Sequence, residues 1–106
     1  MLIVPLQAVP NQSVTTTLNG QQCQINVYQK AYGLYADLYV NNALVVGGVR
    51  CLNQTLMVMD AYLGFSGDLM FIDNQGSSDP TYTGLGARFS LVYLAPADIP
   101  ATSLYD

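Results

Sequence analysis

The sequence predicts an all-β protein: a small antiparallel barrel or sandwich of roughly six to eight short strands, with extended arms at the N- and C-termini. No segment has the roughly twelve residues of capped, helix-periodic pattern that a helix requires. Short runs of alternating apolar and polar residues recur instead, separated by turn residues about every ten positions. All seven acidic residues are aspartate, which favours turns, and none is glutamate, which favours helices.

The chain begins with a segment, residues 1–10, that is either an edge strand or an arm. Residues 2–6 are mostly apolar, and Pro5 and Pro10 interrupt the pattern. Proline cannot donate a hydrogen bond to a β-ladder, so this segment lies at the edge of a sheet or outside it. It can pack on its own domain or pair with a neighbouring copy of the chain, and both alternatives stay open at this point.

The next segment predicts a β-hairpin. Residues 13–18 alternate in polarity, Asn19-Gly20 follows, and residues 22–30 alternate again. Asn-Gly between two alternating runs favours a type I′ turn, because both central residues of that turn need positive φ. The inner face of the return strand carries Cys23, Ile25 and Val27.

Residues 34–40 form a clearly amphipathic strand. The outer face carries Tyr35, Asp37 and Tyr39, and the inner face carries Leu34, Ala36, Leu38 and Val40. Asn41-Asn42 predicts another tight turn. The apolar residues 43–46 run into Gly47-Gly48, where we expect a bulge or a sharp bend.

The second half of the chain predicts fewer and more widely separated strands. Residues 56–59 are an unbroken apolar run, consistent with a strand buried on both faces. Residues 69–73 and 87–94 are strands, and residues 74–84 between them are a loop. Residues 95–106 contain two prolines and predict an extended tail. Without an internal repeat or a linker, residues 1–106 are one domain.

Composition indicates a protein that contacts other proteins. Charged residues make up 9% of the chain against a typical value of about 25%, while hydrophobic residues make up 51%. Such a surface exposes apolar or neutral polar patches, which mark interfaces, although neutral polar residues could also keep a monomer soluble. The three cations, Lys30, Arg50 and Arg88, are scattered, which argues against binding of nucleic acid. The longest apolar run, residues 43–49, is far shorter than a membrane span of about 20 residues.

Residue types argue against catalysis, a cofactor or a metal. The chain has no histidine and no glutamate, so the commonest general base and transition-metal ligand are missing. Ser66 lies in a sequence that superficially resembles a nucleophile elbow, but the second glycine and an activating histidine are lacking. Four aspartates could bind calcium, but their spacing matches no calcium loop. They are Asp60, Asp68, Asp73 and Asp79.

Structural roles can be predicted for the two cysteines and for the glycines and the arginine that follow the loop. No export signal precedes Cys23 and Cys51, so two free buried thiols are expected. Gly84 and Gly86 predict either positive φ or close approach of the backbone. For Arg88 we expect one of two arrangements. The side chain is half-buried and paired with Asp73 or Asp79, or it is solvated and its stem lies over Tyr82.

The tyrosines have three open interpretations. Tyr28, Tyr35 and Tyr39 fall on the predicted outer faces of strands. Tyrosine is enriched at protein interfaces because it offers a large contact area at low entropic cost. Aromatic pairing within one sheet is the second interpretation, and a carbohydrate-binding groove is the third.

A series of short motifs runs along nearly the whole chain. It begins with Val4-Pro5-Leu6 and Val9-Pro10-Asn11-Gln12 and continues through the strand at residues 34–40. The most specific part is Asp60-Ala61-Tyr62-Leu63-Gly64-Phe65 with Gly67-Asp68-Leu69, followed by Asp73, Asp79-Pro80, Tyr82, Gly84-Leu85-Gly86 and Arg88-Phe89. In the order and spacing of these motifs the chain resembles the small baseplate plug family of contractile-tailed phages.

The resemblance implies a non-catalytic structural part of the virion tail baseplate, made in the host cytoplasm. It implies a place near the central hub and tail tube, with baseplate, hub and tube proteins and further copies in a ring as partners. The loop at residues 74–84 and both terminal arms would hold neighbours. A small carbohydrate- or peptide-binding module is the alternative, and an enzyme is a third. The candidate interface and structural residues are Pro5, Pro10, Tyr35, Asp37, Tyr39, Asp60, Tyr62, Gly64, Phe65, Asp79, Pro80, Tyr82, Gly84, Gly86 and Arg88.

Overall fold

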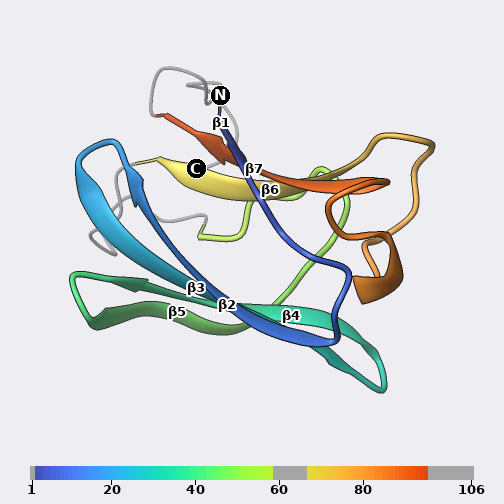
Figure 1. Ribbon diagram of the computed structural model, residues 1–106, viewed down its shortest axis with the longest axis horizontal. Coiled ribbons are helices and arrows are strands. Elements are labelled where there is room, and N and C mark those ends of the chain that lie inside the picture. The colour runs from blue at the N-terminus through green and yellow to red at the C-terminus, as the bar shows by residue number, and fades with distance from the viewer. Residues whose placement is uncertain (1, 59–66, 96–106) are drawn as a thin grey trace.

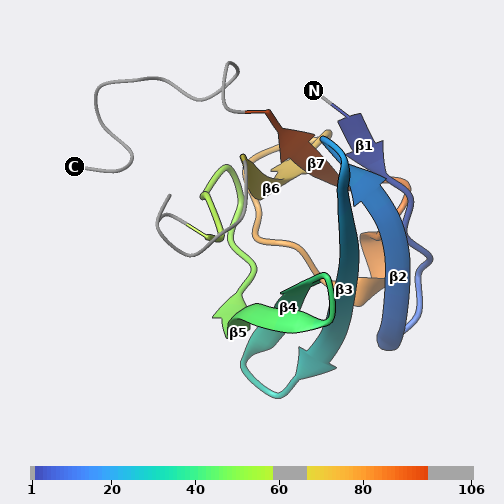
Figure 2. The same ribbon diagram turned by 90° about the vertical axis from the view of Figure 1, so that its left-hand side faces the viewer.

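A computed structural model describes residues 2–58 and 67–95 and shows two antiparallel sheets that face each other without closing into a barrel (Figures 1 and 2). The four-stranded sheet has the order β2-β3-β4-β5, and the three-stranded sheet has the order β1-β7-β6. Of the two predicted architectures, the structure therefore has the sandwich. No helix in the described residues is long and apolar enough to cross a membrane.

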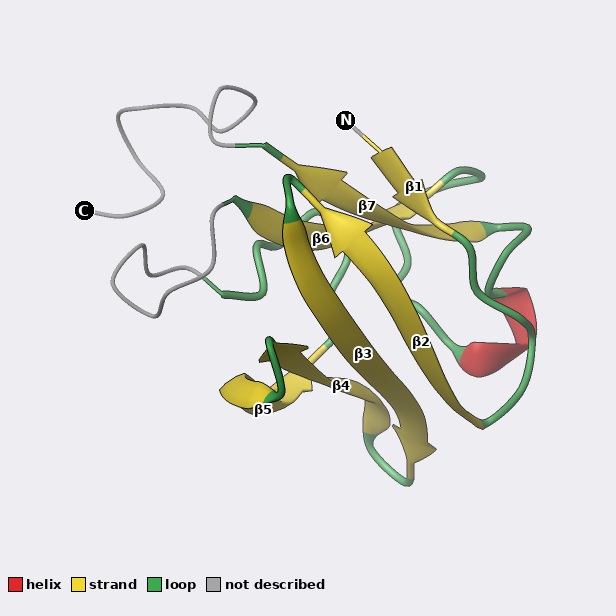
Figure 3. Ribbon diagram, turned by 60° about the vertical axis from the view of Figure 1, so that its left-hand side comes forward, coloured by secondary structure: helices red, strands yellow, loops and turns green. Residues whose placement is uncertain are grey.

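The four-stranded sheet follows the chain order. Its strands are β2 (Asn11–Leu18), β3 (Gln21–Lys30), β4 (Gly33–Val40) and β5 (Ala43–Arg50). Each pairs with the next, so the sheet is a meander of hairpins (Figure 3). Side chains alternate between the two faces of a strand, and the alternating sequence of β4 matches its alternation of buried and half-buried residues.

The turns of this sheet confirm the predicted turn chemistry. Asn19 and Gly20 have φ values of 51° and 75°, and Asn41 and Asn42 have 50° and 67°. These are the left-handed conformations that asparagine and glycine tolerate best, and a type I′ turn requires two of them in succession. Both asparagine-containing turns are therefore as predicted.

The predicted bulge at Gly47-Gly48 is also confirmed. Ala36 pairs with Val49 and Leu38 pairs with Val46, which leaves two glycines opposite Asp37. The Asp37 Oδ1 atom accepts a hydrogen bond of 2.7 Å from the N–H of Gly48, whose φ is 65°. The carboxylate thus binds an N–H group that the interrupted ladder leaves without a strand partner.

The three-stranded sheet joins segments that are distant in the sequence. Its strands are β1 (Leu2–Val4), β6 (Asp68–Asp73) and β7 (Phe89–Leu94), and β7 pairs with the other two. The N-terminal segment thus forms an edge strand of its own domain, which is the first of the two alternatives, while pairing with a neighbouring copy stays a prediction. A short 3₁₀ helix, η2 (Tyr82–Gly84), lies in the connection between β6 and β7.

The core fills the space between the sheets. Phe71 of β6 is completely buried and packs with residues from both sheets. From the four-stranded sheet the core receives the predicted inner residues Cys23, Ile25, Val27, Leu34, Ala36, Leu38 and Val40. Burial of these alternating positions fixes the register, because a shift of one residue would turn every apolar side chain to solvent.

Residues 56–59, which the sequence left ambiguous but consistent with a strand, form no strand in the described part, residues 56–58. Leu56, Met57 and Val58 are buried, but they belong to no strand. Asn53 bridges Phe71 in the parallel sense, whereas Leu56 bridges Met70 in the antiparallel sense. A segment whose two bridges to β6 run in opposite senses cannot form a continuous ladder with it.

Candidate assembly interface

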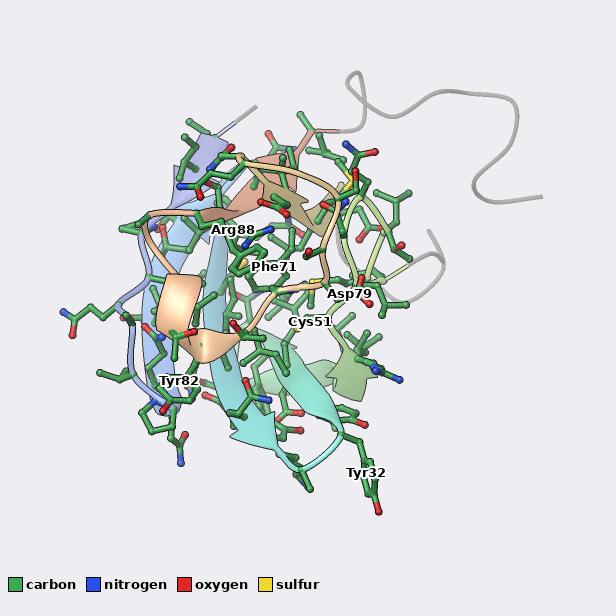
Figure 4. The ribbon with its side chains drawn as sticks, turned by 90° about the vertical axis from the view of Figure 1, so that its right-hand side faces the viewer. Tyr32, Cys51, Phe71, Asp79, Tyr82 and Arg88 are labelled. Atoms are coloured by element: carbon green, nitrogen blue, oxygen red, sulfur yellow. The ribbon has the colours of Figure 1, made fainter. Side chains whose placement is uncertain are left out.

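The predicted site residues fall into three groups. One group belongs to the connection between β6 and β7 and to the N-terminal connection: Pro5, Pro10, Asp79, Pro80, Tyr82, Gly84, Gly86 and Arg88. Figure 4 labels Asp79, Tyr82 and Arg88 of this group. A second group, on the outer face of β4, comprises Tyr35, Asp37 and Tyr39. The remaining predicted residues, Asp60, Tyr62, Gly64 and Phe65, lie outside the described part of the chain.

Asp73, at the end of β6, organises the loop at residues 74–84. Its Oδ1 atom accepts a hydrogen bond of 2.9 Å from the N–H of Gln75, and its Oδ2 atom accepts one of 2.8 Å from the N–H of Ser78. Arg88 donates to the same two oxygens, from Nε at 2.9 Å and from Nη2 at 2.8 Å. The fully buried Asp73 side chain therefore fixes the start, the middle and the far end of the loop.

Arg88 takes Asp73 as its partner, one of the two carboxylates that the sequence proposed. Hydrogen bonding from Arg88 holds the pKa of the Asp73 carboxyl well below its usual range, and the N–H groups of Ser78 and Gln75 act in the same direction. The guanidinium also donates to Ser78 Oγ at 3.2 Å. This bidentate geometry fixes the orientation of the pair as well as its charge.

Asp79, the other predicted partner of Arg88, holds a different segment. Its Oδ1 atom accepts a hydrogen bond of 3.0 Å from the N–H of Asn53, and Asn53 Oδ1 accepts one of 2.9 Å from the N–H of Asp73. Asn53 thus connects the loop to β6. No sequence pattern marks Asn53, because these contacts join residues that are 26 and 20 positions apart and leave no periodic signal.

The far side of the loop rests on the opposite sheet. Pro80 is buried, although Asp79 beside it is exposed. Tyr82 is half-buried against the core, and its N–H donates to Gln29 Oε1 of β3 at 3.2 Å. The N-terminal connection reaches the same strand, because Pro10 O accepts a hydrogen bond of 2.8 Å from the Gln29 N–H. The loop therefore links the two sheets.

Gly84, the last residue of η2, and Gly86, two residues later, are glycines for different structural reasons. Gly86 has φ of 81°, and a Cβ atom there would collide with the carbonyl oxygen of Leu6. Gly84 does not have positive φ, which leaves close approach, the other predicted alternative. Close approach explains Gly84 instead, because a Cβ atom would lie 2.6 Å from Cδ2 of Phe89. Both glycines let this turn pack tightly, one against the N-terminal segment and one against β7.

The outer tyrosines make contacts within their own sheet. Tyr28 and Tyr35 are cross-strand partners whose rings stack with centroids 6.3 Å apart. The Tyr28 hydroxyl donates to Asp37 Oδ1 at 2.9 Å. Burial and this hydrogen bond raise the pKa of Tyr28, which keeps the hydroxyl neutral. Aromatic pairing within the sheet thus occurs at Tyr28 and Tyr35, while Tyr39 is half-buried on the same face and pairs with Gln24.

Asp68 is a buried carboxylate whose structural role the sequence did not reveal. Its Oδ1 atom accepts hydrogen bonds from the N–H groups of Met57 at 3.0 Å, Val58 at 2.8 Å and Leu69 at 2.7 Å. The carboxylate thereby fixes the irregular segment before residue 59 against the first residues of β6. An aspartate beside a glycine predicts a turn, so nothing in the local pattern distinguishes this one.

Neither the cysteines nor the aspartates of the described residues form a reactive cluster. Cys23 and Cys51 are free and buried, and burial raises the pKa of Cys51 to about 12. A thiol with so high a pKa stays protonated and unreactive at neutral pH. Within residues 2–58 and 67–95, no three acidic, cysteine or histidine side chains gather where they could hold a metal ion.

These contacts define a structural β-sandwich domain, in which buried carboxylates hold the protein's own loops. A family model described as "Cyanophage baseplate Pam3 plug gp18" matches residues 1–96. The chain therefore belongs to this family of baseplate plug proteins, which confirms the resemblance seen in the sequence and indicates a structural role in the phage baseplate. None of the curated proteins matches the chain.

Proposed function

We propose that this protein is a non-catalytic subunit of a contractile phage tail. In this proposal it packs around the central hub and the end of the tail tube, and it links them to neighbouring baseplate proteins. The observation that carries the proposal is the family match over residues 1–96. The sequence supports the absence of catalysis, because a chain without histidine or glutamate has few groups for acid–base chemistry.

The arrangement of rigid and exposed parts suits a subunit that contacts several neighbours. The loop at residues 74–84 is anchored by Asp73, while most of its residues are exposed. Edge strand β1 exposes Leu2 and Ile3, at 55% and 69% of their surfaces. An anchored loop loses little further conformational entropy on binding, and exposed apolar side chains on an edge strand provide contact area.

The test of this function is the composition of purified tails. Tails from the phage that encodes this chain should contain it in a fixed ratio to the other baseplate proteins, as measured by quantitative mass spectrometry. A cryo-electron microscopy map should show its seven described strands near the hub. A protein found only in the soluble fraction of the infected cell, or one that binds glycans tightly on an array, would contradict the proposal and favour the carbohydrate-binding alternative.

The contribution of β1 to assembly needs point variants. Deletion of residues 1–9 would remove the buried Val4 and Leu6 and the partner strand of β7, so it would damage the fold itself. Leu2→Ser with Ile3→Ser changes only exposed side chains and should preserve the thermal unfolding temperature within a few degrees. We expect incorporation into tails to fall. Unchanged incorporation would show that β1 contacts no neighbour.

A further inference from the structure

Two of the three cations of the chain meet on the outer face of the four-stranded sheet. Tyr28 pairs with Tyr35, and Tyr35 pairs in turn with Arg50, so these side chains form one row across three strands. Lys30 pairs with Gly33 in the adjacent row. We define the cationic tyrosine patch as Tyr28, Lys30, Tyr32, Tyr35 and Arg50.

Among the residues that the structure describes, the cations of the patch lie against rings and backbone and have no carboxylate as an ion-pair partner. Lys30 Nζ is 5.4 Å from the centroid of the Tyr28 ring. Arg50 covers Gly33, where an added Cβ atom would lie 3.2 Å from Nε. The third cation, Arg88, is held by Asp73. Within the described residues, neither Lys30 nor Arg50 forms an ion pair, so the unpaired positive charge of that part of the chain is concentrated here.

The chemistry of the patch fits a segment that carries carboxylates. Lys30 and Arg50 are exposed, and Tyr32 at the turn between β3 and β4 exposes 83% of its surface. Asp37 lies in the next row, but its Oδ1 atom already accepts hydrogen bonds from Tyr28 and Gly48. Two cations beside exposed aromatic surface attract an acidic segment and give it apolar contact area.

The chain itself supplies the complementary charge. Its net charge is −4, with seven acidic residues against three basic ones. Asp68 and Asp73 are buried, so they cannot reach another molecule. Asp98 and Asp106 follow the last strand within residues 96–106. That short segment therefore carries two carboxylates, which matches the two unpaired cations of the patch.

The patch and the end of β7 lie at opposite ends of the sandwich, and this separation favours binding between copies. The chain leaves β7 at the end of the molecule opposite the β3–β4 turn, where the patch lies (Figures 1 and 3). The described part extends 32 Å along its longest axis, and residues 96–106 span at most about 40 Å when fully extended. A copy placed head to tail brings the segment to the patch without that full extension, and such contacts generate rings when the rotation closes.

We propose that the cationic tyrosine patch binds residues 96–106 of a second copy of the chain. Lys30 and Arg50 bind the carboxylates of Asp98 and Asp106, and the segment covers Tyr32 and Tyr35. This inference rests on the proposed function, and it adds a specific contact between neighbouring copies in the proposed ring.

Lys30 is the single lysine of the chain, which makes the contact directly testable. A carbodiimide joins an amine to a nearby carboxylate through an amide bond, without adding a spacer. We would treat an equal mixture of unlabelled and ¹⁵N-labelled protein with carbodiimide and identify the linked peptides by mass spectrometry. We expect mixed-label peptides that join Lys30 to Asp98 or Asp106, and these should disappear in Lys30→Gln.

Other linkage patterns would overturn the inference. Links from Lys30 that are confined to one chain would show an intramolecular contact. Links from Lys30 to a different protein in purified, carbodiimide-treated baseplates would identify another occupant of the patch. Absence of any Lys30 link to a second copy, in the purified protein and in baseplates, would also exclude the proposal. A chain present in baseplates but lacking the link would refute this inference alone and leave the proposed function intact.

Variants matched in charge give a second, quantitative test. Lys30→Gln with Arg50→Gln and the control Thr17→Glu with Gln54→Glu each make the chain more negative by about two charges. Thr17 and Gln54 are exposed and lie outside the patch. Sedimentation at low salt measures the association constant of each protein. We expect it to fall about five- to tenfold in the patch variant and less than about twofold in the control. In the wild type the association constant should fall as the salt concentration rises. Equal association of the patch variant and the wild type would contradict the proposal.

Discussion

The two sheets of this sandwich are held together in different ways. In the four-stranded sheet every strand pairs with its neighbour in the sequence through tight turns. In the three-stranded sheet β7 pairs with β1, from the opposite end of the chain, and with β6, across the loop at residues 74–84. Local turns bring the first set of strands together, whereas long-range contacts must position the second.

Buried charge follows the same division. Among the described residues, the buried charged side chains are Asp68 and Asp73, and both belong to β6. Each accepts backbone N–H groups from segments that no strand ladder satisfies. Regular pairing thus stabilises one sheet through many similar contacts, while the other sheet depends on a few residues whose contacts no other residue can replace. Single substitutions should therefore be far more harmful in the three-stranded sheet and its loops.

The largest expected effect is at Asp68. Asp68→Ala removes an acceptor of three buried N–H groups, of which the Met57 N–H also donates to Leu69 O. We expect the free energy of unfolding to fall by about 3 kcal/mol. The matched control in the other sheet is Asp37→Ala, which removes a hydrogen-bond acceptor on the outer face of β4. We expect this variant to lower the free energy of unfolding by about 1 kcal/mol. Urea denaturation followed by circular dichroism measures both. Equal losses would show that the two sheets do not differ in their sensitivity to single substitutions.

The second prediction compares two glycines with similar backbone conformations. Gly86 and Gly20 have φ values of 81° and 75°, but only at Gly86 would a Cβ atom meet another residue, at Leu6 O. Gly20→Ala should lower the free energy of unfolding by about 1 kcal/mol from backbone strain alone. Gly86→Ala adds a steric clash and should lower it by about 2–4 kcal/mol. If the two variants are equally stable, close packing of the N-terminal segment does not matter.

The third prediction concerns the acid sensitivity of the loop anchor. The Arg88 hydrogen bonds lower the pKa of folded Asp73 below its ordinary value of 3.8. Ionised Asp73 therefore stabilises the folded protein above that value, and this contribution disappears as the pH falls through the folded pKa. Between about pH 5 and pH 2, the urea midpoint should fall more in the wild type than in Asp73→Asn. Parallel curves for the two proteins would show that other groups control acid unfolding.

The smallest expected effect is at Tyr28, in the regular sheet. Tyr28→Phe removes the hydroxyl that donates to Asp37 and keeps the ring that stacks on Tyr35. Because this site is partly exposed, water replaces the hydroxyl, and we expect a loss of about 0.5 kcal/mol in the free energy of unfolding. Thermal denaturation measures it. A loss above about 2 kcal/mol would place this sheet among the sensitive parts of the molecule.

The sequence predicted the four-stranded sheet almost completely and the loop region only in part. Alternation in β3 and β4, the Asn-Gly turn and the Gly-Gly bulge are local patterns that follow directly from backbone geometry. The irregular segment at Leu56 and the anchoring by Asn53 could not be predicted, because they depend on which distant backbone groups lack partners. The register between three strands had to be known before Lys30, Tyr28, Tyr35 and Arg50 could be placed in one patch.

Side-chain periodicity, turn residues and motif order predicted the all-β class, the hairpins and the family, because these signals are properties of adjacent positions. The folded structure was needed to show that β1 pairs with β7, that Arg88 binds Asp73 and not Asp79, and that Phe89 requires a glycine at position 84. The physical reason is that a buried polar group must find a partner wherever the chain brings one close, and that proximity is set by the whole fold.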